Sequence, residues 1–155
     1  MNIFPLYPKQ VMDLWPLLMP FVDLALQHTH GEMSALDVCE RGMNGAMQIW
    51  MVADAERICG TVVTEIVEFP QLTTLRIVTL AGDNFKEWRV ELDHMMEQFA
   101  RVVGAKRIEA VGRPGWIRAL RDLDYKPAYV IVMRDVPELV SNQKETIHEQ
   151  VGRNN

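Results

Sequence analysis

A chain of 155 residues, 48% of them hydrophobic, has the size of one domain and can bury a substantial core. Its net charge of −5 argues against a general nucleic-acid coat, and no apolar run reaches the ~18 residues that span a membrane. Residues 1–5 lack the basic region of a signal peptide, so the cytoplasm is the expected location. Cys39 and Cys59 are too few for a disulfide framework and are expected to be reduced, structural thiols.

Two helices are predicted before the first strand. Pro16 and Pro20 interrupt the apolar N-terminal region, and proline breaks a helix interior. The prediction is therefore a short turn followed by a helix over residues 16–27. Ser34 begins a second short helix, over residues 35–41, with an acidic residue three positions on as in a capping box.

Three strands are predicted next, over residues 47–53, 57–68 and 72–80. The second is rich in β-branched residues, which favour strands. The turns between the three runs are short. Short turns join antiparallel neighbours, so this region is predicted to be an antiparallel meander.

The apolar period then changes to that of an amphipathic helix, over residues 85–103. A strand over residues 107–111, a short helix over 116–123 and a final strand over 129–134 follow. This order predicts an α/β fold with a mixed sheet, in which the meander is followed by a β-α-β unit. Residues 1–136 are predicted to form one domain, with a polar C-terminal tail over residues 137–155.

The element order and several landmarks resemble those of the GNAT acetyltransferase superfamily. The landmarks are the end of the long helix at residues 100–105 and the short helix that leads into Leu123-Asp124-Tyr125. The segment Gly112-Arg113-Pro114-Gly115-Trp116 is similar to a Gly-Arg-x-Gly-Trp signature of small GNAT-like proteins encoded among tailed-phage virion genes. The resemblance to the superfamily implies a GNAT-like fold. The similarity of residues 112–116 to the phage-encoded proteins implies that the protein is located in the host cytoplasm and the virion.

The acetyl-CoA loop of this family departs from its pattern here. The family's loop reads Gln/Arg-x-x-Gly-x-Gly/Ala, and the corresponding candidates for cofactor binding are Leu80, Gly82, Asp83 and Asn84. One glycine remains, and Asp83 adds negative charge where a polyanion would sit. The family's tyrosine that protonates the leaving thiolate is replaced by Leu120, which cannot donate a proton. We therefore expect no cofactor, or acetyl-CoA if the protein is active.

Glu65 and Glu68 are the candidate catalytic residues, because a carboxylate on a central GNAT strand can deprotonate the acceptor amine. The alternative is that both are solvent-facing strand residues. His28 and His30 flank Thr29, but a zinc site needs more ligands at recognisable spacing, so no metal is predicted.

A basic stretch covers residues 101–126 of this acidic protein. It could bind the 3′-phosphate of CoA, a nucleic-acid backbone or an acidic partner, or be a solvated surface. The partner-binding candidates in this stretch are three arginines and a tryptophan: Arg113, Trp116, Arg118 and Arg121. Nucleic-acid binding is the weakest of these hypotheses because the chain is acidic.

The leading functional hypothesis is a GNAT-fold protein with a degraded acetyl-CoA site that acts through protein-protein contacts, as a phage virion or assembly component. Phage virion proteins are then the expected partners, with the tail after Pro137 as a docking arm. Open sheet edges need cover, which makes a homo-oligomer plausible. The alternative is an acetyl-CoA-dependent N-acetyltransferase with an atypical cofactor loop.

Overall fold

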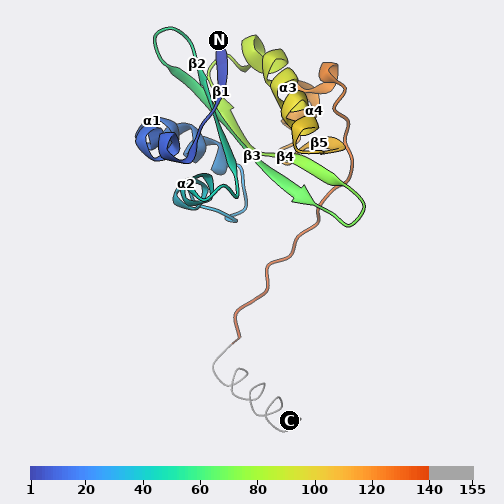
Figure 1. Ribbon diagram of the computed structural model, residues 1–155. Helices are drawn as coiled ribbons and strands as arrows, with labels where there is room; N and C mark the ends of the chain where they lie inside the picture. The colour runs from blue at the N-terminus through green and yellow to red at the C-terminus, as the bar shows by residue number, and fades with distance from the viewer. Residues whose placement is uncertain (140–155) are drawn as a thin grey trace.

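Five strands form one mixed sheet in the order β1-β2-β3-β4-β5, in a computed structural model that describes residues 1–139 (Figure 1). The first four strands are antiparallel neighbours, and β5 is parallel to β4. The α/β class and the meander followed by a β-α-β unit are thereby confirmed. The elements are β1 (Asn2–Pro5), α1 (Pro8–Leu26), α2 (Ala35–Met43), β2 (Gln48–Ala53), β3 (Ile58–Glu68), β4 (Thr73–Gly82), α3 (Phe85–Val102), β5 (Arg107–Ala110), α4 (Gly115–Ala119) and the 3₁₀ turn η1 (Arg121–Leu123).

Helices α1 and α2 cover one face of the sheet (Figure 1). Contrary to the predicted turn and break, α1 is one helix that contains both Pro16 and Pro20. Met12, Pro16 and Pro20 are all exposed and are spaced four residues apart, so they share the solvent face of the helix. Carbonyl groups that lose their N–H donors to proline on that face can bond to water, which makes the two prolines tolerable.

Helix α3 covers the opposite face (Figure 1). Its buried stripe is Trp88, Leu92, Met96 and Ala100, at spacings of four residues, as the amphipathic pattern predicted. This stripe packs on residues of β2, β3 and β4. The sheet is thus buried on both faces, with a hydrophobic core on each side.

Strand β1 was not predicted. It pairs with β2 from Asn2↔Ala53 to Pro5↔Trp50 and buries Ile3 against the α3 side. Four residues are too few to show an alternating pattern in the sequence. Proline at position 5 is acceptable here because β1 is an edge strand.

The predicted final strand over residues 129–134 is wrong for this structure. These residues form neither strand nor helix. Within residues 1–139 their backbone makes no hydrogen bond to a strand, and a strand needs such a partner. The predicted helix over 116–123 is split into α4 and η1, and Asp124, at φ 63°, ends the turn. Of the predicted tail, residues 140–155 lie outside the described part of the chain.

Candidate functional site

Strands β4 and β5 separate part of the way along their length, and a cleft opens between them. They pair from Thr74↔Arg107 to Ile77↔Ala110, and the N–H of Val111 donates to the carbonyl of Ile77 at 3.3 Å. Beyond that point β4 continues to Gly82, still paired with β3 but no longer with β5. The cleft has a volume of about 1430 Å³. Its lining comes from β4, the start of α3, the segment after β5 with α4 and η1, and the end of α1. These are residues 77–82, 84–87 and 89, 111–116, 118, 119, 121 and 122, and 24, 25, 28 and 29.

A β-bulge in β4 coincides with the separation of the strands. Val63 pairs with Thr79 but Thr64 pairs with Ile77, so Val78 is an extra residue in β4. A bulge bends its strand and increases the local twist. The bend therefore accounts for the departure of β4 from β5 after Ile77.

The bulge also changes which residues face each layer. Leu75 and Ile77 belong to the core on the α3 side, and Leu80 packs against the same core, while Val78 packs on the α1 side. Asp83 donates its N–H to the Cys59 carbonyl of β3, so alternation directs the backbone groups of Leu80 and Gly82 toward the cleft. An unpaired strand edge of this kind can bond to an extended ligand.

The N-terminus of α3 lies in the cleft wall. Asn84 precedes the helix in the left-handed conformation, at φ 52°, and its side chain forms no capping hydrogen bond. The first N–H groups of a helix lack intrahelical partners, and the helix dipole favours an anion beside them. Asn84, Phe85 and Lys86 all line the cleft at this end. The position is suited to an anionic ligand.

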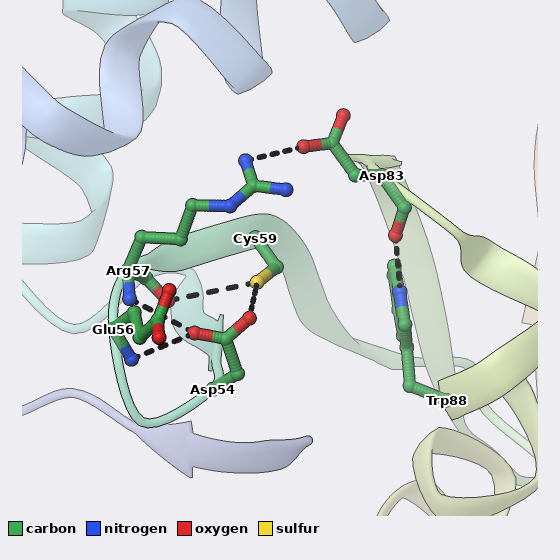
Figure 2. A network of polar contacts seen from close by, with 6 residues as sticks. All are labelled: Asp54, Glu56, Arg57, Cys59, Asp83 and Trp88. Carbon is green, nitrogen blue, oxygen red and sulfur yellow. Dashed lines mark hydrogen bonds and ion pairs between the residues drawn. The ribbon is translucent and has the colours of Figure 1, made fainter.

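The side chain of Asp83 points toward Arg57 (Figure 2). Its carboxylate accepts a hydrogen bond from Arg57 at 2.7 Å, and its carbonyl accepts one from the indole N–H of Trp88 at 2.8 Å. Asp83 is not among the cleft-lining residues. The negative charge expected to repel a polyanion is thus paired with Arg57 and lies outside the cavity.

Gly82 lines the cleft and also allows Trp88 of α3 to pack closely on the sheet. A Cβ atom there would lie 2.7 Å from the Cys59 carbonyl and 2.9 Å from the Trp88 ring. Trp88 is fully buried and crosses the Gly60–Gly82 pair. The glycine therefore allows α3 to approach the sheet at the point where the cleft begins.

Several cations line the cleft. Arg89 donates two hydrogen bonds to Asp122, and these bonds hold the pKa of Asp122 below its usual value. The remaining cations of the lining have no ion-pair partner within residues 1–139; they are Lys86, Arg113, Arg118 and Arg121. The lining contains two acidic residues, Asp122, which is paired with Arg89, and Glu87, which is not. The cavity of this acidic protein therefore has a net positive lining.

The structure joins two sets of predicted residues in this one cleft. Leu80, Gly82 and Asn84 were predicted for a cofactor, and the arginines with Trp116 for a partner, yet all of them line the same cavity. Trp116 packs edge to face on Phe85 of α3, with ring centroids 6.0 Å apart. The loop of residues 111–114 and α4 therefore lie beside the start of α3 in the lining of the cleft.

The predicted catalytic carboxylates lie elsewhere. Glu65 accepts a hydrogen bond from Arg76 at 3.2 Å, and Arg76 also binds Glu109 at 2.6 Å, across three adjacent strands. Glu68 is exposed at the end of β3. Neither residue lines the cleft. The two ion pairs of Arg76, with Glu65 and Glu109, instead hold β3, β4 and β5 together where β4 and β5 are paired.

Groups able to move a proton also differ from those expected. Leu120 is buried, and Tyr125 is outside the cleft, where burial and the neighbouring Asp93 raise its pKa. His28, considered in the sequence as a metal ligand or as a loop residue at a helix end, lines the cleft at the end of α1. Its only sequence signal was its place just after a predicted helix.

No helix within residues 1–139 has the length and apolar character needed to cross a bilayer. The same residues contain no group of three or more His, Cys, Asp or Glu side chains placed to hold a metal ion.

Comparisons with known proteins find a match in structure alone. No model of a protein family matches the sequence, and no curated protein matches it. A ribosomal-protein-alanine N-acetyltransferase from Brucella melitensis biovar Abortus 2308 matches with a TM-score of 0.65 at 12% identity, over 87% of this chain and 100% of that chain. An aminoglycoside acetyltransferase from an uncultured soil metagenomic sample, in complex with sisomicin, has a TM-score of 0.61 at 15% identity, over 90% of this chain and 96% of that chain. At such identities the likeness shows the fold alone, and this fold is the GNAT fold.

Proposed function

We propose that this protein is an N-acetyltransferase that binds acetyl-CoA in the cleft between β4 and β5. One observation carries the proposal: a free strand edge, an uncapped helix N-terminus and unpaired cations converge on a single cavity. The helix terminus and the cations suit the phosphate groups of the ligand, and the strand edge suits its amide-containing arm. This proposal takes up the alternative hypothesis from the sequence and departs from the leading one.

The cleft residues fit the two chemical parts of acetyl-CoA. The start of α3, together with Lys86 and Arg113, suits the phosphate groups, because backbone N–H groups and cations both bind them. The edge of β4 suits the amide-containing arm, which can add to a strand edge through backbone hydrogen bonds. The volume of about 1430 Å³ exceeds that of a usual drug-sized ligand pocket and has room for so large a ligand.

The residues on the α1 side suit an amine acceptor. Bound acetyl-CoA supplies a thioester carbonyl that an amine can attack. His28 lies in this part of the lining, and histidine is the commonest residue to accept a proton in catalysis. Leu120 offers no proton to the leaving thiolate, so solvent takes over that step and turnover is slow.

Calorimetry of the full chain with acetyl-CoA tests the binding step. We expect a dissociation constant in the micromolar range, about −8 kcal/mol. The variant Arg113→Ala/Arg118→Ala is expected to bind at least about tenfold more weakly, since hydrogen bonds to charged groups contribute about 1.5–3 kcal/mol each. Arg41→Ala, which removes an exposed arginine of α2, is the matched control and leaves the affinity unchanged.

Absence of both heat and thermal stabilisation at millimolar acetyl-CoA would overturn the proposal. Equal losses in the cleft variant and the control would also count against it, since they would indicate non-specific charge attraction. If binding is confirmed, a panel of primary amines with acetyl-CoA identifies the acceptor by release of free thiol.

A second candidate function is a non-catalytic role in protein contacts, as in a phage virion or its assembly. Leu120 at the tyrosine position supports it, and so does the similarity of residues 112–116 to phage-encoded GNAT-like proteins. The calorimetry separates the two, because a protein with this role needs no acetyl-CoA.

A further inference from the structure

An apolar segment follows the folded part of the chain and is not packed against it. Tyr129-Val130-Ile131-Val132-Met133 is a continuous run of β-favouring and apolar residues, each between 60% and 91% exposed. Figure 1 shows the chain after η1 passing β5 and leaving the folded part. Runs that are apolar at every position are typical of strands buried on both faces. The segment therefore has the sequence of an inner strand without the partner such a strand needs.

The sheet has an open edge that such a strand would fit. Strand β5 lies at the end of the strand order and pairs only with β4 among the described strands. Strand β4 pairs with one side of β5 along its whole length, from Arg107 to Ala110, so the backbone groups on the other side of β5 point outward. An open edge of this kind is a template for pairing with another strand. Strand β5 has four residues, and the run from 129 to 133, with five, is long enough to pair with all of them.

We propose that residues 129–133 pair with the β5 edge of a second copy of this chain, and that two copies exchange these segments to form a dimer. The proposal does not depend on acetyl transfer. Each copy carries both the segment and the edge, so a two-fold axis satisfies both pairs at once and closes the assembly. The exchanged strand extends each five-stranded sheet by one strand.

The course of the chain favours exchange over pairing within one copy. Asp124, in the left-handed conformation, and Pro127 redirect the chain after η1. No residue from 128 to 139 is hydrogen-bonded to β5 of its own copy, so within residues 1–139 that edge is open. Val111, the residue directly after β5, also has an exposed apolar side chain. A second copy that extends its pairing past the end of β5 would cover it.

Light scattering during gel filtration, together with hydrogen exchange, tests the proposal on the full chain. The expected result is twice the monomer mass, with slow exchange at the amides of residues 129–133 that becomes fast when dilution dissociates the dimer. Ile131→Pro removes a backbone donor, and Val132→Lys places a charge in the run; both are expected to yield monomers. Val136→Lys, equally exposed but outside the run, is the matched control and stays dimeric.

Three outcomes would overturn the exchange. A wild-type protein that is monomeric at all concentrations leaves the edge without its proposed partner. A dimer that persists in both Ile131→Pro and Val132→Lys uses another surface. Slow exchange at residues 129–133 that survives in a monomer shows pairing with β5 of the same copy. The substituted residues lie outside both hydrophobic cores, so the variants remain folded and their tryptophan fluorescence verifies it.

Discussion

The guanidinium group of Arg57 donates a hydrogen bond to the carboxylate of Asp83 at 2.7 Å, beside the N-terminus of α3 (Figure 2). The pair joins the start of β3 to the end of β4, where the cleft begins. Both side chains are about half exposed, so solvent screens their attraction. The chief effect of Arg57 is thus to neutralise a carboxylate close to the proposed phosphate position.

Arg57→Gln is expected to weaken acetyl-CoA binding about threefold at low ionic strength, because an unpaired Asp83 repels the phosphates. Salt reduces the effect, so the difference from wild type shrinks when the ionic strength is raised. Calorimetry at two salt concentrations measures both values. Asp83→Asn in the Arg57→Gln background is expected to restore the affinity. A loss that persists in this double variant would show that Arg57 acts on the ligand in some other way.

Gly82→Ala is expected to destabilise the protein by about 1–3 kcal/mol, because the added Cβ atom overlaps the Cys59 carbonyl and the Trp88 ring. For a chain of this size the melting temperature falls by about 2–10 °C. Thermal unfolding measures the change. Gly115→Ala is the control, since no atom lies within 4 Å of its added Cβ atom. Equal melting temperatures for Gly82→Ala and wild type would show that Trp88 moves aside at little cost.

Asp54 makes stability depend on pH. Its carboxylate accepts the N–H groups of Glu56 and Arg57 and the thiol of Cys59, and these bonds lower its pKa (Figure 2). The unfolded chain therefore binds this proton at a higher pH than the folded chain. The stabilisation is complete above the unfolded pKa of about 4 and is lost as pH falls through the folded pKa.

Asp54→Asn is therefore expected to lower the melting temperature at pH 7 and to have a progressively smaller effect below about pH 4. Thermal unfolding across this pH range gives the measurement. Asp13→Asn, on the exposed side of α1, is the matched control and should have little effect at any pH. A difference for Asp54→Asn that stays constant down to the acid limit would show that its cause is not the charge.

The sequence predicts the regular elements that have strong patterns, but not the features that shape the site. The helix over 85–103 agrees with α3 to within one residue, because its apolar stripe repeats over several turns. The bulge at Val78 was missed, since a bulge is a property of pairing between strands. Its one trace in the sequence is a core-facing series of Leu75, Ile77 and Leu80, in which the second interval is three residues instead of two.

The site residues were found more readily than their roles. Arg113 and Asn84 are far apart in the sequence and were predicted for different ligands, and only the folded chain shows that they line one cavity. The opposite error concerns Asp83. Its charge was visible in the sequence, but its partner Arg57 lies in the turn before β3, 26 residues away. Long-range pairing of this kind leaves no local pattern to read.

His28→Gln provides the most direct test of acetyl transfer. If His28 accepts the proton of the acceptor amine, kcat/KM falls about a hundredfold, the range for loss of a general base, while the affinity for acetyl-CoA is unchanged. His30→Gln is a closely matched control, because His30 is two residues away and does not line the cleft. The measurements are steady-state rates with an amine acceptor and calorimetry with acetyl-CoA. Equal rates for both variants and wild type would mean that the amine loses its proton to solvent, with the cleft contributing only orientation.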